Sequence, residues 1–257
     1  MRLLALLAVA ACLTAADVPT LQVPTLQVPH AASVPPLDAA ATPAAVWTNA
    51  VLIPTLTQSK NGARANSLPA TQVRLLWDSK ALYVRFDCTD AEVYLPFSKH
   101  DDPLFQGDVV EVFLDPVGDA RQWFELQVAA NNATFDQNLV LTAEAKSNAD
   151  GMLLDELLQR DWWMWAGYEM EGLTTAAQQR PDGWTVELAI PAKSAAKRLG
   201  SQTWKAGDKL RANFMRYDWT PPGADGKRGL LPMNWAPVLT GCPHISPQAM
   251  GTLELMP

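Results

Sequence analysis

Hydrophobic and polar residues alternate through much of the chain, and a period of two residues is typical of β-strands. The clearest run is residues 122–130, where Phe124, Leu126 and Val128 fall on one face. Similar runs predict strands at residues 71–78, 81–88, 108–115, 168–178, 184–190, 209–217 and 252–255. Short helices are expected at residues 153–158 and 191–199. Many short strands, little helix and no strand–helix–strand rhythm predict an all-β fold, an antiparallel β-sandwich.

The strand predicted at residues 108–115 contains a carboxylate among apolar neighbours. Val110 and Val112 point to one face, and Phe113 shares the other face with Glu111. Both faces are therefore expected to be covered, and a buried carboxylate needs a partner or a function. One interpretation is an ion pair with an arginine of the sheet, and the other is a polar contact on the floor of a binding cleft.

Residues 1–16 have the pattern of a signal peptide, with one positive charge, an apolar run and small residues at the end. The apolar run is too short for a membrane span. Cleavage after Ala16 would release a soluble protein to the outside of the cell or the periplasm. Alternatively, residues 9–12 resemble a bacterial lipobox, in which Cys12 would be lipidated. Simple secretion is the favoured interpretation because the charged region is minimal.

Residues 17–36 carry the unit Thr-Leu-Gln-Val-Pro twice, followed by two more prolines. This composition predicts an extended, proline-rich linker. Residues 37–257 are then expected to form a single β-sandwich domain. Within it, residues 162–165 contain three tryptophans, which we interpret as a packed loop, with an exposed aromatic rim as the alternative.

The net charge of −7 argues against nucleic acid and anionic membranes as partners and is compatible with neutral ligands. Ten tryptophans could serve as core or as flat platforms on which a ligand stacks. Beyond the leader, the chain keeps Cys88 and Cys242. In an exported protein these two could form a disulfide, or they could be two buried thiols.

The common catalytic motifs are missing, since the chain has neither Gly-x-Ser-x-Gly nor a phosphate-binding loop. We therefore predict a binding protein rather than an enzyme. Asp101 and Asp102 are either solvated or able to hold a calcium ion together with Asp108. A glycosidase would need two carboxylates about 5 to 10 Å apart across a cleft, which sequence does not reveal.

Sugar binding requires an aromatic plane for the ring face and fixed hydrogen-bonding groups for the hydroxyls. The faces opposite the apolar stripes offer Arg85, Glu111, Gln127, Arg211 and Asn213, and Trp219 and Trp235 lie in or beside loops. The same residues could instead be ordinary salt bridges and core tryptophans.

Several short segments, taken in order, make the chain similar to a known family. They are Val46–Ala50, Leu75–Asp78, Leu82–Val84, Asp87–Asp90, Gly107–Pro116, Gly183–Pro191, Arg211–Arg216, Trp235–Pro237 and Pro247–Leu253. The chain resembles the family 9 carbohydrate-binding modules and their DOMON-like relatives. This resemblance implies a jelly-roll-like β-sandwich that binds sugars, often chain ends, between two aromatic rings, and structural calcium is known in the family.

Carried over position by position, the resemblance makes Phe105 the first ring and Trp219 the second, with Trp235 the less favoured choice. It makes Glu111 an acceptor for sugar hydroxyls, and Asn213 and Arg216 match family positions as well. Gln127 is added as a polar contact from the sheet. Phenylalanine at position 105 departs from the tryptophan that the family can have there.

The sequence thus predicts a secreted, non-catalytic carbohydrate-binding protein, accessory to glycoside hydrolases that act elsewhere on polysaccharides. The alternatives are a haem-binding electron-transfer domain and a structural envelope protein without a ligand. Haem ligands would have to come from Met215, Met233, His100 and His244.

Overall fold

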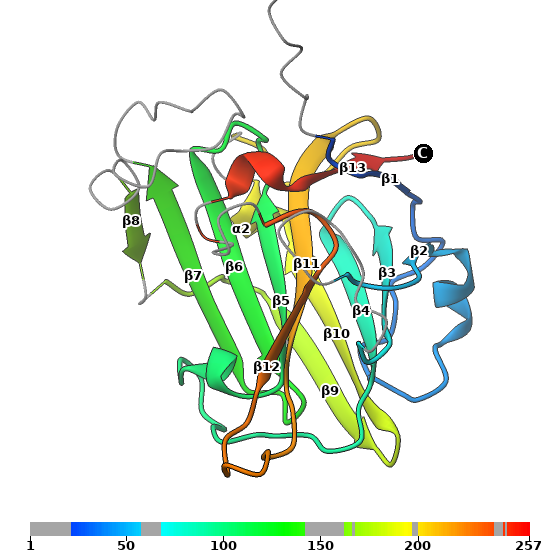
Figure 1. The fold of residues 1–257 in the computed structure, drawn as a ribbon. Coiled ribbons are helices and arrows are strands. Elements are labelled where there is room, and N and C mark those ends of the chain that lie inside the picture. Colours follow the sequence, from blue (N-terminus) through cyan, green and yellow to red (C-terminus); the bar gives the residue numbers. More distant parts are fainter. Residues whose placement is uncertain are drawn as a thin grey trace, which may run out of the picture.

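The computed structural model describes residues 22–57, 68–141, 162–165, 168–196, 200–238, 244 and 246–257. These residues form two β-sheets packed face to face (Figure 1). The larger sheet has the order β1 (Thr25–Val28), β13 (Gly251–Leu255), β11 (Lys209–Trp219), β5 (Val109–Asp115), β6 (Gln122–Ala129), β7 (Thr134–Leu141) and β8 (Trp162–Trp165). Strand β12 (Leu230–Asn234) belongs to the same sheet but lies outside this order and pairs with β11. The smaller sheet has the order β2 (Val51–Ile53), β3 (Thr71–Trp77), β4 (Ala81–Thr89), β10 (Gly183–Pro191), β9 (Thr174–Arg180). The prediction of an all-β sandwich is confirmed.

The described helices are short and lie in connections between strands. They are η1 (Ala45–Asn49), η2 (Leu104–Gln106), α2 (Ala192–Ala195) and η5 (Pro247–Ala249). Pro191 is the N-cap residue of α2, so this helix begins one residue after the predicted position. Within the described part of the chain, no helix has both the length and the apolar character needed to cross a membrane.

The core between the sheets is built from alternate strand positions. Val110 and Val112 of β5 and Leu126 of β6 are buried there with Phe86 of β4 and Val186 of β10. Burial of these apolar side chains is the main force that holds the two sheets together. The same alternation sends every other residue of β5 and β6 to the outer face of the larger sheet.

The outer face of the larger sheet carries a second, smaller apolar cluster. Phe113 and Trp123 are fully buried there and pack with Val238 and Met250, which flank the last connection of the chain. Strand β5 is therefore covered on both faces, as its sequence predicted. The outer face next to this cluster remains open to form a site.

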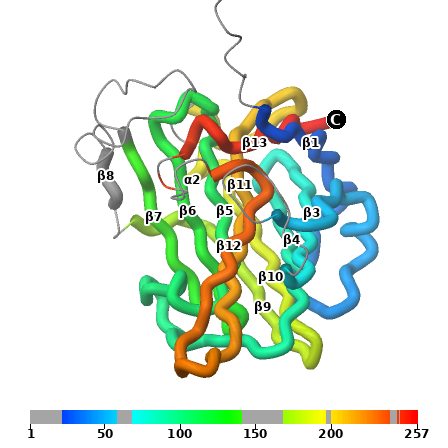
Figure 2. Tube along the Cα trace, viewed as in Figure 1, coloured from blue at the N-terminus to red at the C-terminus, as the bar shows by residue number. Residues whose placement is uncertain are grey.

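The prediction that residues 17–36 form an extended linker is wrong for the second of the two repeat units. Residues 25–28 form β1, which pairs in parallel with β13, and Val28 is fully buried. Figure 2 shows this N-terminal strand in blue beside the C-terminal strand in red. Leu26 and Val28 alternate with polar residues, so the unit can add to an open sheet edge, and its prolines lie just outside the paired residues. The predicted signal peptide and Cys12 lie outside the described residues.

Other differences concern strands whose pattern is weak or whose pairing is distant. Strands β1, β2, β7, β8 and β12 were not predicted, and the strand expected at residues 168–178 begins only at Thr174. Residues 162–165 form the edge strand β8 rather than a loop, because they pair with β7. The helix expected at residues 153–158 lies outside the described part of the chain.

Cys88 of β4 is a free thiol and completely buried, whereas Cys242 lies outside the described residues. Burial raises the pKa of the Cys88 thiol to about 12. This environment fits the buried-thiol alternative for Cys88.

Candidate functional site

A row of polar side chains crosses the outer face of the larger sheet beside the apolar cluster. Strand pairing places Glu111 of β5 opposite Gln127 of β6, and Glu125 of β6 opposite Gln137 of β7. Residues paired across neighbouring strands point to the same face, so these four side chains lie together. All four are at most 4% exposed, so they form the floor of the surface rather than its rim.

A cavity of about 310 Å³ lies over this polar floor. Ligand sites have volumes of about 300–1,000 Å³, so this cavity is suited to one small ligand or the end of a larger one. It is lined by Asp101, Asp102, Pro103, Phe105, Glu111, Glu125, Gln127, Phe135, Gln137, Tyr217 and His244. The walls thus supply three aromatic rings, and Phe105 in η2 is 46% exposed.

Glu125 is the hub of the hydrogen bonds in the floor. Its carboxylate accepts from Nε2 of Gln127 at 2.7 Å, from Nε2 of Gln137, and pairs with Nε2 of His244 at 2.8 Å. Burial opposes ionisation, but the contact with His244 and the two amide donors outweigh it and hold the pKa of Glu125 below its usual value. Glu125 is therefore an ionised acceptor that fixes its neighbours.

Gln127 carries a free acceptor at the floor of the cavity. Its Nε2 is used by Glu125, and its Oε1 is buried with no hydrogen-bond partner among the described residues. A buried carbonyl oxygen without a donor costs free energy, which a ligand hydroxyl could recover.

The indole of Trp219 reaches the backbone of Phe105 at one end of this site. Nε1 of Trp219 donates to the backbone carbonyl of Phe105 at 3.1 Å. Asp108 fixes the junction, because its two carboxylate oxygens accept from the backbone N–H of Trp219 at 2.6 Å and of Tyr94 at 2.5 Å. Trp219 is half-buried beside η2, whereas Phe105 lines the cavity itself.

A family model described as Carbohydrate family 9 binding domain-like matches residues 37–256. The chain belongs to this family. The predicted membership is thus confirmed, whereas the wider relation to DOMON-like proteins stays a prediction.

Relatives of the carbohydrate family 9 binding domains share this fold. A family 9 module from Caldicellulosiruptor kristjanssonii in complex with cellotriose has a TM-score of 0.61 and 19% identity, over 90% of this chain and 93% of that one. The module from the same organism in complex with glucose has a TM-score of 0.60 and 19% identity, over 90% and 95%. A protein of Arthroderma benhamiae named "Extracellular protein" is 28% identical over 153 residues, which are 58% of this chain and 63% of that protein. The chain thus spans less than two thirds of this relative.

Besides Trp219, three residues predicted to contact sugar do not line the cavity. Arg216 is fully buried and pairs with Asp90 and Asp218, because its strand position is opposite Val110 and it points between the sheets. Asn213 shares the outer face but is used by the backbone of Ala236, which it contacts at 3.0 and 2.8 Å.

Trp235 is the third of these residues. Its ring packs on Phe214 at a centroid distance of 5.5 Å, and it closes so tightly on Gly251 that a Cβ atom there would lie 2.4 Å from the indole. Trp235 therefore anchors the connection after β12 rather than a ligand.

The three aspartates predicted to hold calcium serve separate purposes. Asp102 accepts from the backbone N–H of Ser98 and Lys99, and Asp101 lies 3.5 Å from the His100 ring. Asp108 is buried on its two backbone donors. The described residues therefore do not gather this trio around one ion.

Asp108 instead meets two other buried carboxylates, Asp90 and Asp218. Both of these pair with Arg216, and Asp90 also accepts from Nε1 of Trp184 at 3.2 Å. Arg216 and the backbone donors of Asp108 hold this group in place, and the contacts of Arg216 join the two sheets.

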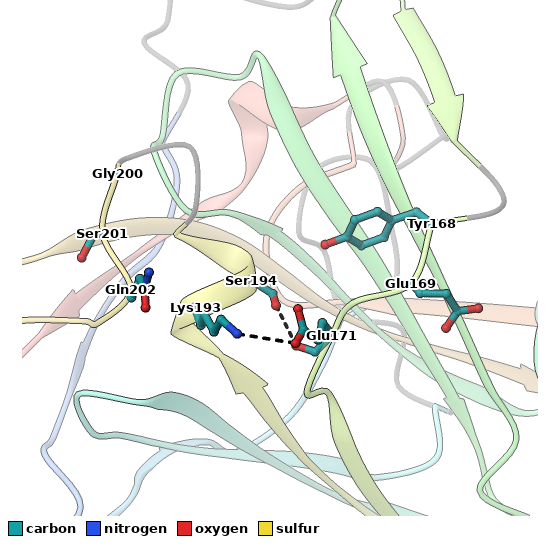
Figure 3. Close-up of a pocket in the computed structure, with 8 residues that line it drawn as sticks. All are labelled: Tyr168, Glu169, Glu171, Lys193, Ser194, Gly200, Ser201 and Gln202. Atoms are coloured by element: carbon teal, nitrogen blue, oxygen red, sulfur yellow. Dashed lines mark hydrogen bonds and ion pairs between the residues drawn. The ribbon is translucent and has the colours of Figure 1, made fainter.

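Two further hollows differ from the outer-face cavity in chemistry. One, of about 320 Å³, lies between the segment after β8, α2 and residues 200–202 (Figure 3). Its polar groups satisfy one another, since Lys193 reaches Glu171 at 3.5 Å and Ser194 donates to the Glu171 carbonyl at 2.6 Å. The other, near Arg74, Asp87 and Arg180 on the smaller sheet, is lined by no aromatic ring.

Sequence reasoning missed six residues of the cavity: Pro103, Glu125, Phe135, Gln137, Tyr217 and His244. Glu125 could have been found, because it lies two positions before Gln127 in the same strand and therefore points to the same face. The β7 residues depend on a strand whose alternation was not recognised. His244 lies 119 positions from Glu125, and no local pattern indicates their contact.

Proposed function

We propose that this protein is a non-catalytic carbohydrate-binding protein that holds a neutral sugar, or the end of a glycan chain, in the outer-face cavity. The observation that supports this most directly is an exposed ring, Phe105, beside a buried polar floor with an unsatisfied acceptor on Gln127. A sugar has an apolar ring face and a rim of hydroxyls, and this combination suits both.

The charges of the cavity favour neutral ligands over acidic ones. Four carboxylates line it, at Asp101, Asp102, Glu111 and Glu125, and His244 is the one basic side chain in its described lining. A uronate would bring a fifth negative charge to this surface, and like charges in an interface cost several kcal/mol. We therefore expect glucose-type sugars to bind and their uronic acids to be rejected.

The same geometry disfavours catalysis. Glycoside hydrolysis needs a carboxylic acid that keeps its proton near neutral pH. The pKa of Glu125 is shifted in the opposite direction, and its oxygens are occupied by three donors. A fixed, ionised acceptor serves to orient hydroxyls rather than to donate a proton.

Within the described part of the chain, we see no comparable site for haem. His100 and His244 are each hydrogen-bonded to a glutamate. Met215 and Met233 point to opposite faces of their sheet, since Met215 packs in the outer cluster and Met233 in the core.

Export to the cell exterior is part of the proposal, supported by the leader-like residues 1–16 and by the name of the Arthroderma benhamiae relative.

Isothermal titration with glucose, cellotriose and glucuronic acid tests the proposal. Phe105→Ala should weaken binding of the neutral sugar roughly fivefold, which corresponds to about 1 kcal/mol of stacking. Gln127→Leu should weaken it further, because the acceptor is lost without a change of shape. Leu230→Ala is the matched control, since it removes an exposed apolar side chain of β12 outside the cavity lining.

Two results would contradict this assignment. Failure of every glycan on a broad array to bind would remove the proposed function. Binding that survives both cavity substitutions with unchanged affinity would keep the function and move the site elsewhere.

A further inference from the structure

A cluster of one imidazole and three carboxylates lies beside the sugar cavity. Nε2 of His100 is 2.8 Å from Oε1 of Glu169, 3.5 Å from Oδ1 of Asp101 and 4.0 Å from Oδ1 of Asp136. The ligand atoms of His100, Asp136 and Glu169 all lie within 4.8 Å of one another. The four residues come from the connection before β5, from β7 and from the segment that leads into β9.

The ring of His100 is held in a defined orientation. Its Nδ1 contacts Oγ1 of Thr134 at 2.9 Å, and the backbone N–H of Asp101 donates to the Thr134 carbonyl at 3.0 Å. Nε2 of the same ring faces the carboxylates. Because an imidazole lone pair and anionic oxygens repel one another, a proton on Nε2 or a metal cation has to lie between them.

Asp136 provides an independent sign that a cation belongs here. Its side chain is 3% exposed, and its Oδ2 is fixed by the backbone N–H of Met170 at 2.6 Å. Its Oδ1 lies 4.0 Å from Nε2 of His100, on the side of the cluster. A buried carboxylate is costly unless hydrogen-bond donors or a positive group face it.

The positive charge available from the protein is small. Among the described residues, His100 is the one basic side chain within 4 Å of these three carboxylates. Three carboxylates therefore face one imidazole, and a divalent cation balances more of this negative charge than a single proton does.

We propose that His100, Asp136 and Glu169 bind one divalent transition-metal ion, of which Zn²⁺ is the representative, with Asp101 beside them as a further carboxylate. Nitrogen from imidazole combined with carboxylate oxygen is a zinc donor set, whereas calcium takes oxygen ligands alone. The metal takes the place of the Nε2 proton, which is released to solvent. His100 and Glu169 are partly exposed, so the ion can enter from solvent.

Such an ion would connect the aromatic wall of the sugar cavity to the rest of the fold. The connection that bears His100 and Asp101 continues into η2, which carries Phe105. Asp136 belongs to β7 and Glu169 to the segment before β9, so the metal would tie three segments at one point. The metal site itself does not depend on the sugar-binding proposal.

The test is isothermal titration of the chelator-treated full protein with ZnCl₂ at pH 7.5, with CaCl₂ in a parallel experiment. One equivalent of zinc should bind, and calcium should bind far more weakly or not at all. His100→Gln and Glu169→Gln should each weaken zinc binding at least tenfold. Glu171→Gln is the matched control, because Glu171 is an exposed acid two positions away that pairs with Lys193.

Glu169 is 68% exposed, so its substitution leaves packing unchanged and keeps the test valid if a His100 variant is poorly folded. Zinc affinity should also fall as pH is lowered, because protons compete for Nε2. Unchanged zinc affinity in both His100→Gln and Glu169→Gln would overturn the proposal. Calcium binding in preference to zinc, or loss of zinc from a His244→Ala variant with His100 intact, would overturn it as well.

Discussion

Arg216 provides the sharpest contrast between a predicted sugar contact and a structural role. Its guanidinium is fully buried and contacts the Thr89 carbonyl at 2.9 Å, Asp90 at 3.0 Å and Asp218 at 2.5 Å. It also lies over the Trp184 ring at 5.5 Å from the centroid. These contacts join β11 to β4 and β10, and none of them reaches the sugar cavity.

Replacement of Arg216 by methionine would keep much of the volume and remove the charge. Two buried carboxylates would then lose their shared cation. Removal of one partner from a buried ion pair costs about 3–5 kcal/mol, because the remaining charge is left unpaired. We expect a loss of about 3–4 kcal/mol at pH 7. The loss should be smaller at pH 5, because burial raises the pKa of Asp218 and favours its protonated form.

Urea unfolding followed by tryptophan fluorescence measures this change. Arg74→Met is the matched control, since Arg74 pairs with Asp87 at 2.5 Å near the surface and should cost less than about 1 kcal/mol. Sugar affinity of the folded Arg216→Met protein should equal that of the parent. A large loss of sugar affinity with unchanged stability would refute the structural role and restore the contact that the sequence predicted.

Two further predictions concern stability. The pKa of Asp108 is raised to about 7 from 3.8, first by burial and then by Asp90 and Asp218, despite two backbone donors. Because the folded pKa lies above the unfolded one, the protonated form stabilises the fold, and the unfolding free energy should fall by up to about 4 kcal/mol as pH rises from about 4 to about 7. Urea unfolding at several pH values in this range should show the decline. If Asp108 causes it, the unfolding free energy of Asp108→Asn should depend less on pH than that of the parent, and an equal dependence would exclude Asp108. Val28→Ala should cost about 1–3 kcal/mol, because Val28 is fully buried in β1, and no loss would mean that residues 25–28 are a linker after all.

The sequence predicted well to which face of a strand each side chain points. Glu111 and Gln127 were placed on polar faces, and pairing of β5 with β6 brings them together in the cavity. The physical reason is local, because successive side chains of a strand point to opposite faces whatever the strand pairs with. The fold class follows from the same alternation.

Long-range pairing is what the sequence did not predict. Trp219 meets Phe105 across 114 positions, and His244 meets Glu125 across 119. Arg216 and Tyr217 are adjacent in sequence, yet one is buried between the sheets and the other lines the cavity.

The sequence by itself determined that alternating residues would build a sandwich with polar groups on an outer face. Only the tertiary structure decided which polar groups share a cavity, which pair inside the core, and that the second repeat unit closes a sheet edge. Alternation arises from the geometry of neighbouring residues, whereas a site arises from strand register and loop closure between residues far apart in the chain.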